Sequence, residues 1–400
     1  MGVPFREIEM GPVGSRLPGG AVSSAFAIDA GILVQFTDGS ATFLPDWLRD
    51  NCQCDECRIR QTDERRWQPW VEPTAPVVEM VDVVDGQLRL GWASGHQSTY
   101  GPAEWDKIRT TGSRGAWTAR LWSAGYEVER FDHHQCIADQ VTRRGMFEAL
   151  RRDGAVVVTG SPTEPGTVIG LLRELGITLR DSSLGLIFDV KLDPAGYNIA
   201  FTAEEVPPHN DNAQYSHPPS GQVLAMLVND AQGGNSVVVD GWSVLDRLNR
   251  ENPEAIDVLT KVEVGFRQYS TEADAFTRAP LVVRDRAGRF VHLRFSNQLM
   301  QPLAFDDTEL AAWYRAYRLL GAAIADTANH VSFRLSAGDT LFVNGYRVLH
   351  ARTAYQPDGP RHLQDVYFEF DDVHGHLARM TGEATNAMVA SPSSHHRSVS

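Results

Sequence analysis

Two kinds of hydrophobic pattern alternate along this chain. Short continuous apolar runs, of which Val223–Val228 and Ala155–Thr159 are the clearest, are typical of strands buried on both faces. Elsewhere apolar residues recur every three or four positions, which is the period of an amphipathic helix. Helices with this period are expected at Val141–Arg152, Val168–Leu175, Trp242–Asn249, Pro253–Thr260 and Glu309–Asp326. The pattern therefore predicts a chain that mixes buried strands with helices.

The first part of the chain carries shorter strands. Val77–Val84 and Gln87–Trp92 are predicted strands, and the Asp85-Gly86 pair between them is typical of a hairpin turn. A chain of 400 residues exceeds what one hydrophobic core usually organises, so two domains are expected. We assign the N-terminal domain to 1–127 and the second domain to 128–385, followed by a Ser-rich tail at 386–400 that is typical of disorder.

Charge and composition exclude several classes of function. The net charge is −14 and no extended basic cluster is present, so a nucleic-acid partner is not expected. No apolar run approaches the roughly 20 residues that a membrane-spanning helix needs. The sequence also has no P-loop, no Gly-x-Ser-x-Gly motif and no dinucleotide-binding fingerprint. An enzyme that acts on a small molecule is the class that remains.

Three of the four cysteines, Cys52, Cys54 and Cys57, lie together in a polar stretch. Gly and Pro interrupt the first thirty residues, which lack the apolar core of a secretory leader, so we expect a cytoplasmic protein. In a reducing compartment clustered thiols bind metals rather than form disulfides, and an odd set needs a fourth ligand. His96 can supply that ligand and complete a closed tetrahedral zinc site. Three unligated thiols are the alternative.

The segment His209-Asn210-Asp211 offers a second, different metal site. On an extended segment the side chains of residues i and i+2 point to the same face, so His209 and Asp211 can bind one ion side by side. His350, just beyond a predicted strand, can close a triad of two imidazoles and one carboxylate. Such a triad leaves three positions of the ion open, as in non-haem Fe(II) oxygenases. The alternative is a surface His-x-Asp pair with no role.

Arg361 follows the last of these ligands after a Gly-Pro turn. A planar guanidinium recognises a carboxylate through two parallel hydrogen bonds and keeps its charge, so Arg361 is a natural anchor for a dicarboxylic acid. A surface arginine is the alternative.

These motifs, together with Leu48-Arg49-Asp50-Asn51-Cys52 and Gly233-Gly234-Asn235-Ser236, resemble the gamma-butyrobetaine dioxygenase-like family of Fe(II)/2-oxoglutarate-dependent oxygenases, within the taurine dioxygenase superfamily. The resemblance implies an α+β, mainly β chain, in which a double-stranded β-helix (jelly roll) catalytic domain follows a small zinc-binding, β-rich N-terminal domain. It implies a homodimer as well. The roles that it implies are iron ligation by His209, Asp211 and His350, and binding of the distal carboxylate of 2-oxoglutarate by Arg361 and Ser236.

The resemblance also implies contacts to the substrate. An aromatic cage for a trimethylammonium group would be formed by Leu184, Phe188, Phe201 and Tyr367, and the carboxylate end of the substrate would meet Asn198 and Asn297. Leu184 is not aromatic, and the phenylalanines lack phenol or indole groups, which weakens the attraction for a cation. Either asparagine could instead cap a loop.

We therefore expect an Fe(II)- and 2-oxoglutarate-dependent dioxygenase that uses O2 to hydroxylate an unactivated C–H bond of a small amino acid, betaine or biosynthetic intermediate. Succinate and carbon dioxide would be released. Hydroxylation of gamma-butyrobetaine or trimethyllysine themselves stays open, as do desaturation and cyclisation. A zinc-dependent hydrolase is the alternative from another class, and it would leave Arg361 without a task.

Overall fold

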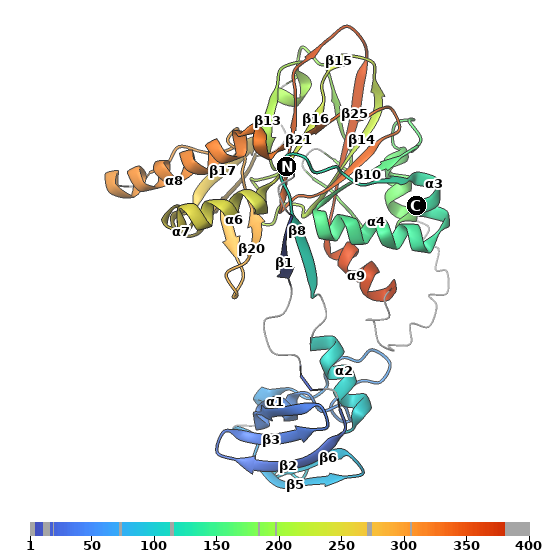
Figure 1. Ribbon diagram of the computed structural model, residues 1–400, viewed down its shortest axis with the longest axis vertical. Helices are drawn as coiled ribbons and strands as arrows, with labels where there is room; N and C mark the ends of the chain where they lie inside the picture. Colours follow the sequence, from blue (N-terminus) through green and yellow to red (C-terminus); the bar gives the residue numbers. More distant parts are fainter. Residues whose placement is uncertain are drawn as a thin grey trace. The chain divides into compact units, whose positions relative to one another are not determined.

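The computed structural model describes residues 5–10, 17–18, 20–71, 74–112, 116–182, 185–196, 198–269, 274–304 and 306–380 (Figure 1). They fall into two compact units. Strand β1 (Arg6–Met10) pairs antiparallel with β8 (Trp117–Leu121), and both strands belong to the larger unit, with the residues that follow β8. The sequence-based domain 1–127 therefore contains, at its two ends, strands that the structure groups with the larger unit.

Two sheets form the centre of the larger unit. A seven-stranded sheet has the order β11-β25-β14-β22-β10-β9, with β12 also paired to β25, and a four-stranded sheet has the order β13-β23-β16-β21. The first sheet consists of β9 (Arg130–Asp132), β10 (Ala155–Thr159), β11 (Leu179–Arg180), β12 (Phe188–Lys191), β14 (Gly221–Asn229), β22 (Thr340–Asn344) and β25 (Arg361–Phe368). The second consists of β13 (Val206–His209), β16 (Ser236–Asp240), β21 (His330–Phe333) and β23 (Val348–Arg352). Neighbouring strands are far apart in sequence, and the predicted jelly-roll fold is confirmed.

Three hairpins and short 3-10 turns complete the β-structure of this unit. The hairpins pair β15 (Gln232–Gly233) with β24 (Tyr355–Gln356), β17 (Val264–Tyr269) with β18 (Asp274–Ala279), and β19 (Val282–Arg284) with β20 (Phe290–Leu293). The 3-10 turns are η2 (Ile199–Phe201) and η3 (Thr327–Asn329). The two apolar runs noted in the sequence lie in β14 and β10, in which nearly every residue is buried.

The predicted helices are present, with ends shifted by one or two residues. The helices of the larger unit are α3 (His133–Ala138), α4 (Gln140–Asp153), α5 (Thr167–Glu174), α6 (Gly241–Glu251), α7 (Pro253–Lys261), α8 (Asp307–Ala325) and α9 (Asp371–Met380). Asp139 caps α4 by accepting hydrogen bonds from Val141 N and Thr142 N, and Gly154, at φ 80°, ends it. Pro253 at the first turn of α7 separates that helix from α6.

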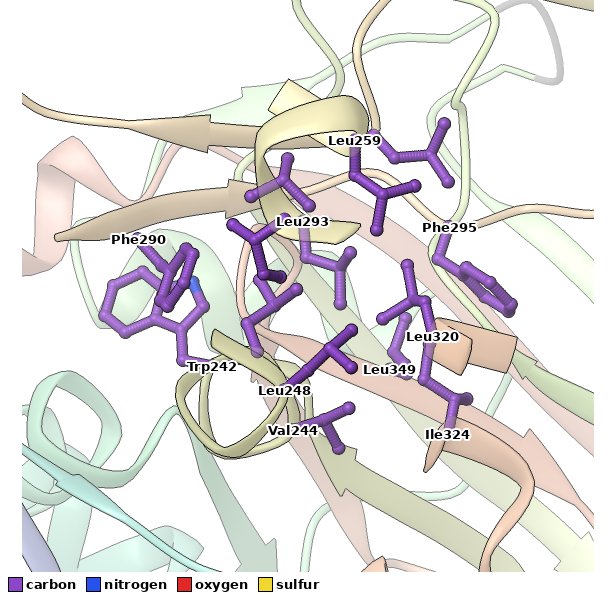
Figure 2. Packing of buried hydrophobic residues seen from close by; sticks show 14 of the residues in the cluster. Trp242, Val244, Leu248, Leu259, Phe290, Leu293, Phe295, Leu320, Ile324 and Leu349 are labelled. Carbon is purple, nitrogen blue, oxygen red and sulfur yellow. The ribbon is translucent and has the colours of Figure 1, made fainter. Parts of the chain in front are cut away.

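A hydrophobic core lies between the second sheet and helices α6, α7 and α8 (Figure 2). Leu349 of β23 is fully buried in this core, where Leu248 and Leu320 reach it from two of the helices. Successive side chains of a strand point to opposite faces, so burying Leu349 turns the next residue, His350, away from this core. The core thereby fixes the direction of a predicted metal ligand.

A buried ion pair secures the turn that leads into β23. Arg347 donates from Nε to Asp240 Oδ1 at 3.0 Å and from Nη2 to Oδ2 at 2.7 Å, and neither side chain is exposed. Asp240 Oδ1 also accepts from Trp242 N at 3.1 Å and so caps α6. Paired and capped in this way, the two buried charges have their hydrogen bonds satisfied, which limits the cost of removing them from water.

The smaller unit is built from two three-stranded antiparallel sheets. They are formed by β2 (Val22–Ile28), β3 (Gly31–Phe36) and β4 (Gly39–Phe43), and by β5 (Val78–Val84), β6 (Gln87–Trp92) and β7 (Gln97–Tyr100), with α1 (Pro45–Asp50), η1 (Pro69–Val71) and α2 (Pro102–Gly112) beside them. Asp85 and Gly86 join β5 to β6 with φ values of 52° and 76°, as the predicted hairpin turn requires. Trp105, 1% exposed, lies at the centre of its core. In the described part of the chain, no helix has the length and apolar character needed to cross a membrane.

Candidate active site and metal centres

The structure brings His209, Asp211 and His350 together. His209 ends β13 and pairs directly with His350 of β23, and their ring centroids are 4.4 Å apart. Asp211 Oδ1 lies 3.2 Å from His209 Nε2, and its Oδ2 lies 3.7 Å from His350 Nε2. The ligand atoms of the three side chains all lie within 4.8 Å of one another. Two imidazole nitrogens and one carboxylate at this spacing fit a single Fe(II) ion.

Neighbouring groups orient each side of this triad. His209 Nδ1 lies 2.9 Å from the carbonyl oxygen of Pro207, which holds the ring so that Nε2 faces Asp211. Asp211 Oδ2 accepts hydrogen bonds from Gln222 Nε2 at 2.7 Å and from the Tyr367 hydroxyl at 2.9 Å. One oxygen of the carboxylate is thus held by two donors while the other faces His209. Ligand positions supported in this way need little rearrangement when a metal binds.

The residue between the two ligands of the motif has a structural role. Asn210 is buried, donates from Nδ2 to the carbonyl oxygen of Gly345 at 2.8 Å and accepts from Phe295 N at 2.9 Å. These bonds tie the segment after β13 to the turn before β23. Asn210 therefore fixes the backbone from which His209 and Asp211 project to the other side.

Electrostatics favour a charged carboxylate beside a neutral imidazole. Burial lowers the pKa of His350 to about 4, and the nearby His209 acts in the same direction. Burial by itself raises the pKa of Asp211, but the positive charges and hydrogen bonds of the histidines reverse this effect and bring its pKa below the usual range. A deprotonated carboxylate and an imidazole with a free lone pair are the forms that bind metals.

The triad lies on the wall of a cavity of about 120 Å³. Arg361 and Ser236, the residues predicted to bind 2-oxoglutarate, line the same cavity and are 8% and 7% exposed. Among the described residues no carboxylate forms an ion pair with Arg361, and its Nε has no hydrogen-bond partner. Burial and the charge of Arg352 lower the pKa of Arg361 to about 10. A buried guanidinium without a counter-charge is suited to an anionic ligand.

The predicted substrate contacts fare differently from one another. Phe188, Tyr367 and Asn198 line the cavity, although Asn198 Oδ1 also accepts from Ala200 N and caps a 3-10 turn. Phe201 is not among the lining residues and packs behind Phe188, with ring centroids 5.3 Å apart. Asn297 is exposed and does not line the cavity. Leu184 lies outside the described residues.

The failure of Asn297 has a simple geometric cause. Its Oδ1 accepts a hydrogen bond from the hydroxyl of Tyr317 at 2.8 Å, which turns the amide to the surface. The residues on either side of it, Ser296 and Gln298, line the cavity instead. An offset of one position is enough to exchange the side that a side chain faces.

Sequence reasoning missed two polar groups of this cavity. Asp365 lines it, is 3% exposed and accepts from Gln222 and Tyr367, while Arg352 lines it and donates to the carbonyl oxygens of the segment at 200–204. Burial and the charge of Asp211 raise the pKa of Asp365 well above its usual range. The signal was present in the two-residue period of β25, because Asp365 shares a strand face with Arg361.

The predicted zinc ligands also converge, in the smaller unit. The Sγ atoms of Cys52, Cys54 and Cys57 lie 3.5, 3.8 and 3.7 Å from His96 Nε2, and none of these cysteines is in a disulfide. A zinc ion with usual Zn–S and Zn–N bond lengths in tetrahedral geometry puts sulfur and nitrogen about 3.5 Å apart. Glu56 Oε2 lies 3.0 Å from His96 Nδ1 and can orient the ring. The four side chains therefore fit a closed zinc site.

Comparison with known proteins gives matches along most of the chain. The model described as taurine catabolism dioxygenase TauD, TfdA family matches residues 120–367, and the gamma-butyrobetaine hydroxylase-like N-terminal model matches residues 28–107. Gamma-butyrobetaine dioxygenase of Pseudomonas sp. (strain AK-1) is 32% identical and is aligned over 88% of this chain and 94% of its own length. Trimethyllysine dioxygenase of Meyerozyma guilliermondii is 24% identical, over 88% and 93%. A solved structure of asparagine oxygenase is 22% identical with a TM-score of 0.46, over 60% of this chain and 82% of that one.

Proposed function

This chain belongs to the TauD/TfdA family of dioxygenases, and we propose that it oxidises an unactivated C–H bond of a small amino acid, betaine or biosynthetic intermediate. It is an Fe(II)- and 2-oxoglutarate-dependent dioxygenase. The observation that carries the proposal is the convergence of His209, Asp211 and His350 on the wall of a cavity that also contains an uncompensated buried arginine.

We infer that the triad holds the iron. When bound, Fe(II) supplies the activation of dioxygen, coupled to conversion of 2-oxoglutarate into succinate and carbon dioxide. Asp211 contributes a charged oxygen whose partner oxygen is held by Gln222 and Tyr367. The protein's own task is to position the reactants and to exclude bulk water, and the buried walls of the cavity serve both purposes.

Arg361 and Ser236 are our candidates for the distal carboxylate of 2-oxoglutarate. Arg361 begins β25 and Ser236 begins β16, and both side chains face the cavity. A bidentate contact from the guanidinium and one from the hydroxyl would fix the length and direction of the co-substrate. This arrangement distinguishes the assignment from a zinc hydrolase, in which a buried arginine at this position has no use.

The names of the relatives guide the substrate class. Gamma-butyrobetaine dioxygenase and trimethyllysine dioxygenase are named for small nitrogen-containing acids, and we propose that the substrate here is of this general kind. Hydroxylation is the proposed outcome. Desaturation or cyclisation remains a variant of the same chemistry, and the mass of the product distinguishes them.

Three further features are proposals of ours. We propose a zinc-binding N-terminal domain separate from the catalytic domain, a homodimer, and a cytoplasmic location in which the three clustered thiols stay reduced. Light scattering of the purified protein at several concentrations tests the dimer. A constant monomeric mass contradicts it.

The decisive experiment is anaerobic reconstitution with Fe(II) and 2-oxoglutarate, followed by exposure to oxygen in the presence of a panel of small amino acids and betaines. We expect succinate whose yield depends on one class of panel member, together with a product heavier by one oxygen. A product lighter by two hydrogens redirects the assignment to desaturation or ring closure. Turnover with zinc in the absence of oxygen contradicts the proposal.

A further inference from the structure

The cavity has opposite charges along one of its walls. Strand β25 presents alternate residues to it, namely Arg361, Leu363, Asp365 and Tyr367. Four residues of extended chain separate the Cα atoms of Arg361 and Asp365 by about 13 Å. A guanidinium therefore occupies one end of this wall and a carboxyl group lies toward the other. Since the guanidinium end is the proposed site of 2-oxoglutarate, the carboxyl end is left to face the substrate.

Asp365 has hydrogen-bond partners but no counter-charge. Gln222 Nε2 lies 3.0 Å from each of its oxygens, and the Tyr367 hydroxyl lies 2.7 Å from Oδ2. No arginine, lysine or histidine of the described chain forms an ion pair with it, and Asp211 nearby is itself acidic. The two charges of a bound ferrous ion would be balanced by Asp211 and by the carboxylate of the keto acid. Asp365 would then remain the uncompensated acid of the cavity, a situation that favours a cationic ligand.

An aromatic ring stands beside this carboxyl group. Phe188 of β12 pairs directly with Asp365 of β25, and both side chains line the cavity. Side chains that are directly opposite in an antiparallel pair have Cβ atoms about 4.5 to 5.5 Å apart. A cationic nitrogen between them would meet a carboxylate on one side and an aromatic ring on the other, so that ionic and cation–π attraction act together.

Resting on the dioxygenase function proposed above, we propose that Asp365 makes this site select a substrate whose cationic nitrogen carries at least one N–H. An ammonium with an N–H can donate a charge-assisted hydrogen bond to the carboxylate. A quaternary ammonium has no donor, and its methyl groups would cover the buried oxygens without satisfying them. The aromatic surroundings do not compensate, because Phe201 stands behind Phe188 rather than on the cavity wall.

A series that differs only in methylation tests this selection. The probes are 4-aminobutyrate, its N-methyl and N,N-dimethyl derivatives, and gamma-butyrobetaine, with the same four compounds built on 5-aminopentanoate so that chain length is varied independently. Binding is measured by anaerobic calorimetry on the wild-type protein loaded with Fe(II) and 2-oxoglutarate. We expect members with an N–H to bind at least tenfold more tightly than the quaternary member of the same series. Equal or tighter binding of the quaternary compounds overturns the proposal, as does failure of every N–H member to bind.

An isosteric variant connects the selection to its residue. Asp365→Asn keeps the size and an acceptor oxygen but removes the negative charge, and we expect it to reduce the tenfold preference to less than threefold. The matched control is Asp189→Asn, which removes one carboxylate from the neighbouring strand β12, where Asp189 bonds to Gln364. A preference that survives in Asp365→Asn, at full 2-oxoglutarate binding, overturns the role of Asp365. Failure of the wild type to bind 2-oxoglutarate or form succinate would instead contradict the proposed dioxygenase function.

Discussion

The two candidate metal centres of this protein differ in how many ligands the chain supplies. In the smaller unit four side chains surround one point, and the sulfur-to-nitrogen distances of 3.5 to 3.8 Å match the edge of a zinc tetrahedron. In the larger unit three side chains approach one point from the wall of a cavity. A full set of protein ligands makes a metal structural, whereas an incomplete set leaves positions for reactants.

The surroundings of the two centres differ in the same sense. Around the cysteines, Arg49 donates to Cys57 Sγ at 3.0 Å and Tyr100 donates to a backbone carbonyl, so polar groups close the site. Around the triad, Arg361 and Asp365 face the cavity without counter-charges from the described chain. Uncompensated charge is costly in a folded protein. Its presence at only one of the two centres indicates where ligands are expected to bind.

The largest effect is expected from opening the closed site. Cys57→Ser should release the zinc and unfold the smaller unit, because structural zinc contributes on the order of 10 kcal/mol to small domains that it organises. Zinc content by mass spectrometry and hydrogen exchange over residues 20–107 measure the two effects. Cys136→Ser is the matched control, since Cys136 is also a buried free thiol but lies in the larger unit. Full zinc content in Cys57→Ser would remove this residue from the site.

The next effect concerns the open site, where loss of a ligand should cost activity and leave the fold intact. His350→Ala is expected to lower succinate formation by about 10³-fold, which corresponds to ~4 kcal/mol of barrier height. The melting temperature should change little, because buried Leu349 keeps β23 in the core. His362→Ala provides the control, since His362 bonds to Asp189 and does not line the cavity. Substantial turnover by His350→Ala would refute the triad.

The co-substrate end of the cavity should show a smaller change. Arg361→Ala is expected to weaken 2-oxoglutarate binding by about 2 to 5 kcal/mol, the usual cost of removing one partner of a buried charged pair. Anaerobic titration of the Fe(II)-loaded protein with 2-oxoglutarate measures this change. An exposed arginine, Arg286, supplies the control substitution to alanine. If both variants bind the co-substrate equally well, Arg361 does not contact it.

The zinc ligands and the strands of this protein could be predicted from sequence because their signals are local. Cys52, Cys54 and Cys57 lie within one short loop, and only His96 had to be added from a distance. The apolar runs of β10 and β14 and the periods of α4 and α6 likewise depend on neighbouring residues. Local patterns of this kind survive whatever the rest of the chain does.

The walls of the cavity could not be predicted because they depend on which face of a distant strand is turned inward. Asn297 was placed one position away from the side chains that line the cavity, and Phe201 one layer behind it. Asp365 escaped notice although its face follows from that of Arg361, two alternations earlier on the same strand. The pairing of β1 with β8 was missed for a related reason, since it joins segments that the sequence separates by the whole smaller unit.

The smallest effect separates the two centres by the groups behind their ligands. Tyr367→Phe removes one of the two donors to Asp211 Oδ2 and should weaken Fe(II) binding by roughly 10-fold to 100-fold. Glu56→Gln removes the partner of His96 Nδ1, but the Glu56 side chain is 82% exposed, so zinc retention should change less. Metal titrations of the two variants in parallel provide the measurement. The reverse order would mean that the closed site depends on its outer groups more than the open one does, because only a site with free positions lets its remaining ligands shift while the metal stays bound.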